Sequence, residues 1–388
     1  MIKTVKIMLL PNKKQETKLI QSAGTARFAF NWALGREQES YEAGGKFISD
    51  RELRKEFTKL KASTGYAWLN GYSNNIPKQA IKDACTAYKN FFDGRAQFPK
   101  LKSRKKSRPS FYADPCKIQF TDTHVKLEKI TLSRKKNRQK LNWIRLAERG
   151  RVPSGRKYYN PRVTFDGIHW FISVGLEDQE RSEKPENKGI GIDLGIKDLA
   201  VCSDLEQPYR NINKTDKVRK LKKKKRRLQR QISRKYENNR KGDSYCKTEN
   251  IKRAEKRLIK ISHRMNGIRQ NHLHQTTAEI INRKPRFIVM EDLNIKGMLK
   301  NRHLSKAIAE QCFYEFYRQI EYKSAWNHIK LIKADRFYPS SKKCSCCGAV
   351  KKDLKLKDRT YQCRECGFEA DRDKNAAMNL YHYGKAAV

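Results

Sequence analysis

The stretch GIGIDLGIKDLAV, residues 189–201, decides the fold of the C-terminal half of the chain. Its pattern of branched apolar and small residues predicts a strand, a turn and a second strand. On the first strand, Asp193 would lie between Gly191 and Gly195, on the face opposite the branched apolar residues. The two glycines leave that face without bulk, so a metal ion and a phosphate could approach the carboxylate. The alternative is that Asp193 only caps a turn.

A second candidate carboxylate, Glu291, ends the apolar stretch FIVME, residues 287–291. An apolar run without alternation is typical of a central strand that is covered on both faces. A carboxylate at the end of such a strand is costly to bury unless it is paired, hydrogen-bonded or bound to metal. The alternative is an exposed residue just past the edge of the sheet.

The third candidate lies in DRDKNAAMNL, residues 371–380, where either Asp371 or Asp373 could cap the start of a final helix. Carboxylates from three separate elements suit a site for two divalent ions ~4 Å apart. One ion would activate the attacking water, and the other would stabilise the leaving 3′ oxygen. Ligands that are all oxygen atoms favour Mg²⁺ or Mn²⁺ over zinc.

Four late cysteines have a zinc-ribbon spacing, C-x₂-C-x₁₅-C-x₂-C, and each pair is followed by glycine. They are Cys344, Cys347, Cys363 and Cys366. Four thiolates complete a tetrahedron around zinc, so the site is expected to be closed and structural. Cys346 lies inside the first pair and could compete as a ligand.

The composition indicates a nucleic-acid-binding protein. Lys and Arg total 88 and Asp and Glu total 41 in 388 residues, so the formal net charge is 88 − 41 = +47. A surface this basic binds a polyanion, and phosphate backbones are the commonest one. No stretch approaches ~18 consecutive apolar residues, so no membrane span is expected. The remaining cysteines are scattered, which is typical of a reduced protein of the cytoplasm.

Residues 214–270 are predicted to form a basic helical hairpin around the polar loop 236–250. Apolar residues recur at heptad spacing before the loop (Val218, Leu221, Leu228 and Ile232) and after it (Ile251, Ala254, Leu258, Ile261, Met265 and Ile268). The hairpin is expected to bind phosphates through Lys222, Lys223, Lys224, Lys225, Arg226, Arg227 and Arg230. The alternative is a solvated charge run with no partner.

The N-terminal half alternates between strand and helix patterns. Residues 2–10 read as a strand, and helical patterns follow over 15–44, 50–60 and 77–92. Residues 98–110 are basic and extended, which suits a strip lying along phosphates. Short strands are expected over 115–176, with a hairpin turn at Asp166-Gly167. The polar stretch 178–188 is the expected domain boundary.

Five stretches, taken in order, resemble the TnpB proteins of bacterial insertion sequences, which are relatives of the type V CRISPR effector nucleases. The first two are MLLPNKKQETKLIQSAGTARFAFNWAL (8–34) and FFDGRAQFPKLKSRKKSRPSF (91–111). GIDLGIKDLA (191–200) resembles the first RuvC motif and FIVMEDLNIKGM (287–298) the second. YPSSKKCSCCG (338–348) and YQCRECGFEADRDKNAAMNL (361–380) resemble the family's zinc ribbon running into the third motif. The ordered set is more specific than GIDLG alone.

The resemblance implies a multi-domain α+β protein. Residues 1–12 and 98–184 would form a wedge-like β-barrel, with a helical recognition lobe inserted at 13–97. Residues 185–343 and 367–388 would form an RNase H-like (RuvC) nuclease domain, interrupted by a zinc ribbon at 344–366. Asp193, Glu291 and Asp371 would be the catalytic, Mg²⁺-binding carboxylates, with Asp373 as the near-equivalent of Asp371.

The resemblance also implies partners and an activity. A guide RNA from the transposon end would direct the protein to double-stranded DNA beside a short target-adjacent motif, and both strands would be cut. Such a protein would lie in the bacterial cytoplasm, associated with the nucleoid. Two alternatives stand beside this hypothesis: an unguided transposase that cuts transposon-end DNA, and a zinc-ribbon repressor that binds nucleic acid without cutting.

Overall fold

The chain folds as two units, Met1–Gln179 (the N-terminal unit) and Glu180–Val388 (the C-terminal unit). The computed structural model describes residues 2–131, 139–178, 185, 187–355 and 358–388. The predicted boundary at 178–188 therefore lies largely outside the described residues. Within the described ranges, no helix is long and apolar enough to cross a membrane.

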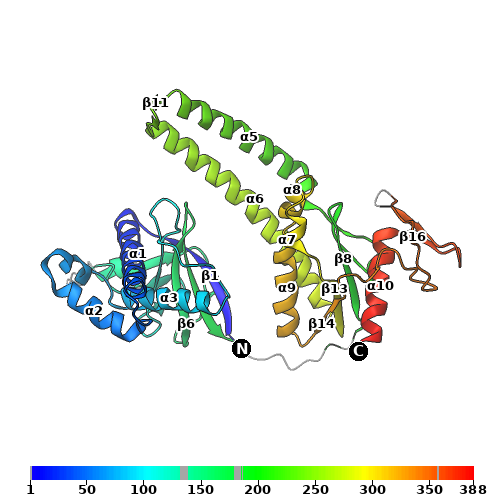
Figure 1. Cartoon of the computed structure of the whole chain (residues 1–388), viewed down its shortest axis with the longest axis horizontal. Coiled ribbons are helices and arrows are strands. Elements are labelled where there is room, and N and C mark those ends of the chain that lie inside the picture. Colours follow the sequence, from blue (N-terminus) through cyan, green and yellow to red (C-terminus); the bar gives the residue numbers. More distant parts are fainter. Residues whose placement is uncertain (1, 132–138, 179–184, 186, 356–357) are drawn as a thin grey trace. The chain divides into compact units, whose positions relative to one another are not determined.

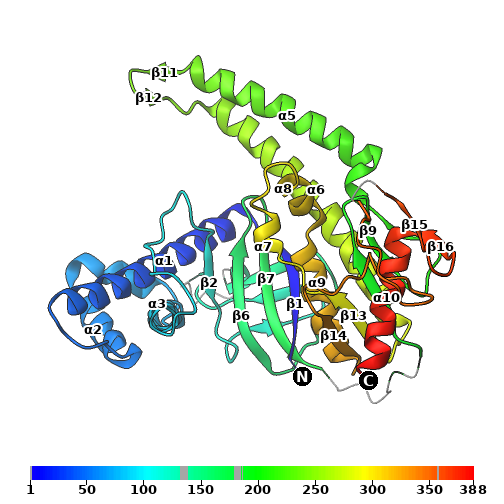
Figure 2. The ribbon, with the colours of Figure 1, turned by 45° about the vertical axis from the view of Figure 1, so that its right-hand side comes forward.

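The N-terminal unit contains a seven-stranded sheet in the order β2-β6-β7-β1-β5-β4-β3. Its centre is β1 (Ile2–Leu10), which pairs antiparallel with β7 (Trp170–Glu177) and with β5 (Trp143–Leu146). Figure 2 shows β6, β7 and β1 side by side. The other strands are β2 (Ser110–Tyr112), β3 (Gln119–Phe120), β4 (His124–Lys126) and β6 (Tyr158–Phe165). Both hydrogen-bonded neighbours of the first strand thus come from the second half of this unit.

Three helices are inserted between β1 and β2: α1 (Lys13–Glu42), α2 (Asp50–Ala62) and α3 (Asn75–Phe92). Asn12 and Gln15 form a capping box at the start of α1, which satisfies backbone donors there. The Gln15 amide also donates to the carbonyl oxygens of Leu141 and Trp143, beside β5. The side chain that caps this helix therefore also attaches it to the sheet.

The C-terminal unit is built on a five-stranded sheet in the order β10-β9-β8-β13-β14. The strands β8 (Ile190–Leu194), β13 (Phe287–Glu291) and β14 (Lys330–Ala334) are parallel neighbours. Two further strands continue the sheet: β9 (Asp198–Cys202) pairs antiparallel with β8, and β10 (Tyr209–Arg210) pairs antiparallel with β9. Figure 1 shows α9 (Phe313–Trp326) on one side of this sheet and α10 (Arg372–Ala386) on the other.

Glycines allow α10 to approach the sheet closely. A Cβ at Gly191 would lie 2.1 Å from the Ala377 carbonyl oxygen, and one at Gly384 would lie 2.3 Å from Val289 Cγ2. The expectation that Gly191 leaves open space for a metal ion is therefore wrong, because α10 fills that space. Only Gly can occupy positions where another backbone approaches this closely.

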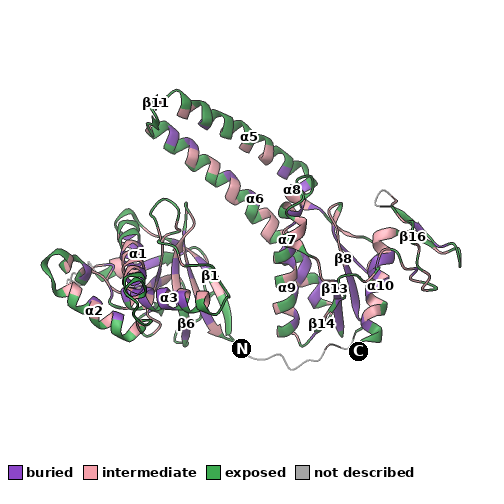
Figure 3. Cartoon of the chain, viewed as in Figure 1, coloured by how far each residue is buried: buried purple, intermediate pink, exposed green. Residues whose placement is uncertain are grey.

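The helical hairpin consists of α5 (Asp216–Glu237) and α6 (Glu249–Asn282), joined by a short β-ribbon, β11 (Arg240–Lys241) and β12 (Ser244–Tyr245). Apolar residues of both helices form its seam: Val218, Leu221, Leu228, Ile261, Met265 and Ile268. Figure 3 shows that the outer surfaces of the hairpin are largely exposed. Helix α6 continues without a break to Asn282, twelve residues past the predicted end at 270. Its last turns pack Leu273, Ile280 and Ile281 into the core of the five-stranded sheet.

Candidate active site and metal centre

Asp193 and Glu291 lie at the carboxyl ends of neighbouring parallel strands. The register between β8 and β13 pairs Ile190 with Ile288 and Ile192 with Met290, and the next residues are Asp193 and Glu291. Side chains alternate along a strand, so both carboxylates are on the face that Gly191 presents to α10. Adjacent strands lie only about 4.8 Å apart, so the two carboxylates lie near each other at this edge of the sheet.

Helix α10 brings a third carboxylate to the same place. Ala377 and Tyr381 are the residues whose backbone lies against Gly191. One helical turn before Ala377 is Asp373, on the same side of the helix. Two residues after Gly191, on the same face of β8, is Asp193. The spacing 373, 377, 381 therefore directs Asp373 toward Asp193.

Asp371 has a different position. It is the N-cap of α10, and its side chain accepts hydrogen bonds from the backbone N–H groups of Asp373 (2.9 Å) and Lys374 (3.2 Å). The residue is exposed, whereas the Asp373 side chain is 18% exposed and pairs with Arg372. Of the two helix-start carboxylates that the sequence left open, Asp371 caps the helix.

The electrostatic environment of Asp193 also indicates that Asp373, rather than Asp371, is its closer neighbour. Burial raises the pKa of the Asp193 carboxyl well above its ordinary range, and the charge of Glu291 raises it further. Asp373 raises this pKa more than Asp371 does, while the Arg372 guanidinium lowers it. Negative charge is thus concentrated around Asp193 beyond what Arg372 offsets. All the candidate metal-ligand atoms here are carboxylate oxygens, which suit a hard divalent cation such as Mg²⁺.

The candidate carboxylates form a looser group than the four cysteines do. Among the described residues, the one group of possible metal ligands whose atoms all lie within 4.8 Å of one another is the four-cysteine cluster. The carboxylates are gathered at one edge of the sheet without forming a group as tight as that. Without a cation, neighbouring carboxylates repel one another. A cation bound between them would attract each carboxylate and offset that repulsion.

Polar residues outside the predicted site stabilise the edge of the sheet at which the carboxylates lie. Ser340 donates a hydrogen bond to Glu291 Oε1. Asn379 on α10 is buried and donates to the carbonyl oxygens of Ser340 (2.8 Å) and Lys343 (2.6 Å), and Asn375 donates to Lys343 (2.7 Å). In the sequence, the only indication of this role is the spacing of Asn375 and Asn379, which places two amides on the same side of one helix.

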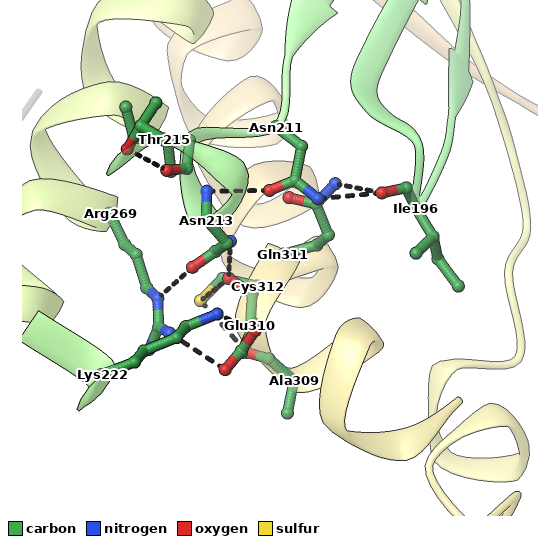
Figure 4. Close-up of polar contacts among 11 residues, drawn as sticks. Ile196, Asn211, Asn213, Thr215, Lys222, Arg269, Ala309, Glu310, Gln311 and Cys312 are labelled. Atoms are coloured by element: carbon green, nitrogen blue, oxygen red, sulfur yellow. Dashed lines mark hydrogen bonds and ion pairs between the residues drawn. The ribbon is translucent and has the colours of Figure 1, made fainter. Parts of the chain in front are cut away.

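A polar network supports the turn that follows Asp193 (Figure 4). The Gln311 amide donates to the carbonyl oxygen of Gly195 (2.9 Å), and the Asn211 amide donates to that of Ile196 (2.8 Å). Gln311 is buried and ends α8 (Ser305–Gln311), just before Cys312 in the left-handed conformation (φ 57°). Buried amides with satisfied hydrogen bonds fix backbone position, so this network holds the turn in place.

The same network fixes the base of the helical hairpin. Glu310 pairs with Lys222 of α5 (2.6 Å) and with Arg269 of α6 (3.5 Å), as Figure 4 shows. Arg269 also donates to the Asn213 side chain (2.7 Å). Lys222 is therefore engaged inside the protein. The predicted contacts that are largely exposed are Lys223, Lys224, Arg226, Arg227 and Arg230, whereas Lys225 is partly buried.

Basic side chains also line a groove between the two hairpin helices. Its volume is about 650 Å³. Four basic residues line it, together with Leu228, Gln231 and Ile261: Lys224, Arg227, Arg257 and Lys260. A groove with cationic walls and a partly apolar floor suits a phosphate backbone with its sugars.

The four cysteines of the zinc-ribbon pattern converge. The sulfur of Cys344 lies 3.8 Å from that of Cys366, and the sulfur of Cys347 lies 3.6 Å from that of Cys363. Four sulfurs around zinc, each ~2.3 Å from the metal, would be about 3.8 Å apart. The geometry therefore fits a closed tetrahedral site. Cys346 is exposed and is not part of the cluster.

The ribbon leads directly into the candidate active site. Its hairpin, β15 (Thr360–Gln362) and β16 (Glu369–Asp371), ends at the residue that caps α10. Glycines with positive φ follow each cysteine pair, Gly348 (81°) and Gly367 (70°), as the tight turns of a ribbon require.

Three family models match the chain. They are described as "Helix-turn-helix domain" (residues 1–46), "Probable transposase" (171–302) and "Cas12f1-like, TNB domain" (313–380). Over residues 2–46, the structure has strand β1 and the single long helix α1. The last two matches cover most of the C-terminal unit, including all the candidate carboxylates.

Relatives match along nearly the whole chain. A Streptomyces pristinaespiralis protein named "Putative RNA-guided DNA endonuclease" is 30% identical over 98% of this chain and 89% of its own length. The Escherichia coli (strain K12) protein named "Putative RNA-guided DNA endonuclease InsQ" is 29% identical over 100% of this chain and 93% of its own. The cryo-EM structure of a Cas12f1–sgRNA–target DNA complex has a TM-score of 0.54 at 13% identity, with 98% of each chain covered.

The fold is therefore that of the Cas12f1-like class of proteins. Within that class, the chain belongs to the TnpB family, as the ordered motifs of its sequence predict.

Proposed function

We propose that this protein is an RNA-guided, metal-dependent endonuclease that cuts double-stranded DNA beside a short target-adjacent motif. The observation that carries the proposal is the gathering of Asp193, Glu291 and Asp373 at one edge of the five-stranded sheet. The names of the full-length relatives support the same activity. In this proposal the C-terminal sheet is an RNase H-like (RuvC) domain, and the N-terminal sheet with its inserted helices is the wedge and recognition lobe.

We assign the third catalytic position to Asp373 and a positioning role to Asp371. The 373–377–381 side of α10, which packs on Gly191, supports this assignment. So does the stronger effect of Asp373 on the pKa of Asp193. Asp371 uses its carboxylate to accept backbone hydrogen bonds at the start of α10, which sets where that helix begins.

The residues of this edge would divide the work as follows. Asp193, Glu291 and Asp373 would hold Mg²⁺ or Mn²⁺, which when bound supplies activation of water and charge stabilisation at phosphorus. The Ser340 hydroxyl orients the Glu291 carboxylate. Arg372, beside Asp373, contributes positive charge where a phosphate would approach. The network through Gln311 keeps the turn after Asp193 fixed while nucleic acid binds.

Guide and target would be held mainly through their phosphates. The exposed lysines and arginines of α5, and the groove between α5 and α6, would contact the backbone without reading bases. Base pairing with the guide would then supply sequence specificity. The four-cysteine cluster would hold a structural zinc ion.

Neutralising exposed hairpin residues is expected to weaken nucleic-acid binding and flatten its salt dependence. The test variant carries Lys223→Gln, Lys224→Gln and Arg227→Gln. Each lost phosphate contact lowers the slope of log K against log salt by ~0.9 for a duplex, so a loss of roughly two to three is expected. A matched variant changes three exposed basic residues of α2: Arg51, Lys55 and Lys59. A slope for the hairpin variant that equals the slope for the parent would place the phosphate contacts outside the hairpin.

The guided mechanism is tested by the RNA that the protein retains. The chain is expressed with its native flanking DNA, and the RNA that survives a high-salt wash is sequenced. A discrete RNA that ends in transposon-end sequence, and that directs Mg²⁺-dependent cutting of a matching duplex, is the expected result. Random fragments together with cutting of transposon-end DNA in the absence of RNA would favour the unguided transposase.

A further inference from the structure

An aromatic pocket lies in the N-terminal unit and contains none of the candidate residues of the C-terminal unit. Its volume is about 220 Å³. The end of α1, the loop at 45–47, the end of α3 and Phe98 line it. Six aromatic rings form most of its wall: Tyr41, Phe47, Tyr88, Phe91, Phe92 and Phe98.

The rings of Phe47, Tyr88, Phe91, Phe92 and Phe98 form a chain of contacts, but the group is not sealed from solvent. Tyr41 is 71% exposed and Phe92 is 55% exposed. The Phe98 ring meets Phe91 edge-on at 5.3 Å between centroids. A group of large rings left at the surface marks a binding site more often than it marks a core. Flat aromatic walls suit a flat ligand, because rings of any base can stack on them.

A buried carboxylate lines the same pocket. Glu37 is 4% exposed, and its Oε2 accepts a hydrogen bond from the Ile48 backbone N–H (3.2 Å). The contact of its Oε1 with Cys85 Sγ is long, at 4.0 Å. An acidic oxygen with a weak partner, set among aromatic rings, is an acceptor suited to an exocyclic amino group.

Basic residues continue from the pocket along the chain. Phe98 is followed by six lysines and arginines: Lys100, Lys102, Arg104, Lys105, Lys106 and Arg108. The Asn31 side chain of α1 holds this strip by two hydrogen bonds of 2.8 Å to the Lys102 backbone. At the pocket itself, Lys46 lines the wall and Lys89 lies over the Phe47 ring. The pocket thus has cationic surroundings that complement a phosphate chain.

We propose that this pocket binds one unstacked nucleobase that carries an exocyclic amino group, from a single strand whose phosphates lie along residues 100–108. The rings stack on the base and Glu37 accepts from its amino group. The proposal rests on the nucleic-acid binding in the proposed function but not on cleavage. Thymine and uracil present a carbonyl oxygen where cytosine presents an amino group, so the pocket disfavours them.

The test is binding of the full chain to four labelled single strands of about 12 nucleotides, oligo-dC, oligo-dT, oligo-rC and oligo-rU. Fluorescence anisotropy is recorded over a range of salt and compared at high salt, where phosphate contacts contribute little. The variants are Phe47→Ala/Phe92→Ala and Glu37→Gln. The control is Tyr314→Ala, an aromatic residue that is 69% exposed in the C-terminal unit.

Phe47→Ala/Phe92→Ala is expected to weaken binding of the C-containing strands by roughly five- to a hundred-fold, because stacking on aromatic rings is lost. Glu37→Gln is expected to remove the preference for C over T or U while the melting temperature stays near that of the parent. The DNA and RNA arms show which strand the pocket takes.

Affinities of Phe47→Ala/Phe92→Ala that match those of Tyr314→Ala on all four strands would overturn the proposal. So would a dimer of the parent chain that the double variant converts to a monomer without loss of affinity, since a second copy would then be the occupant. A chain that binds with the expected base preference but does not cut DNA would contradict the proposed function and leave the pocket assignment intact.

Discussion

Asp193→Asn is expected to abolish DNA cleavage and, in metal-free buffer, to make the protein more stable. Loss of a carboxylate that holds catalytic metal should reduce the cutting rate on the order of a thousand-fold or more. Burial and the charges of Glu291 and Asp373 raise the pKa of Asp193, so its ionised form is disfavoured in the folded protein. Asparagine has nearly the same shape and no charge, and it removes this penalty.

The sign of the pH dependence follows from that raised pKa. Below the unfolded-state value near ~4, Asp193 is protonated in both states and the variant has no advantage. As pH rises from there through the raised folded-state pKa, the parent loses stability and the advantage of Asp193→Asn grows. Thermal melts of both proteins with a chelator across this pH range measure it, and a constant difference in melting temperature would contradict the account. Added Mg²⁺ should stabilise the parent and leave the variant unchanged.

The DNA cleavage assay also distinguishes the role of Asp371 from that of Asp373. Asp373→Asn should eliminate cutting as Asp193→Asn does. Asp371→Asn keeps a side chain that can cap a helix, so most activity should be retained. Full activity of Asp373→Asn together with an inactive Asp371→Asn would reverse the assignment.

Loss of the metal from the four-cysteine cluster is expected to unfold the ribbon and abolish cutting. Cys363→Ser removes one of four ligands, and closed thiolate sites contribute folding free energy, ~10–16 kcal/mol in isolated zinc-finger peptides. Strand β16 runs into α10, so disorder in the ribbon reaches the helix that carries Asp373. Elemental analysis should find zinc in the parent and far less in the variant, with proteolysis beginning within residues 341–370.

Cys346→Ser is the matched control. Cys346 is exposed and lies between two cluster cysteines without belonging to the cluster. It should retain zinc, stability and cutting. Equal zinc loss from Cys346→Ser and Cys363→Ser would mean that the ligand set includes Cys346.

Local patterns in the sequence were sufficient to predict several features. The cysteine spacing predicted the cluster, and the strand pattern of 189–201 predicted β8 and β9. The heptad spacing predicted the seam of the hairpin. Each of these depends on residues that are near in sequence, or on a spacing that one ligand geometry imposes.

The remaining features depend on contacts between distant segments. Gly191 suggested open space because a sequence does not show that α10 packs there, 186 residues later at Ala377 (377 − 191 = 186). Asp371 and Asp373 are indistinguishable until the side of α10 that faces the sheet is known. The pairing of β1 with β7 is also non-local. The aromatic pocket joins the ends of two helices and so has no sequence pattern.

The position of α10 in the chain has a consequence for biosynthesis. Asp373 is translated 180 residues after Asp193 (373 − 193 = 180), whereas the hairpin helices end at Asn282. At ~5–20 residues per second, the growing chain exposes its basic hairpin several seconds before Asp373 leaves the ribosome. Under the proposed function, a nascent chain could therefore hold RNA through its hairpin before Asp373 completes the proposed nuclease site.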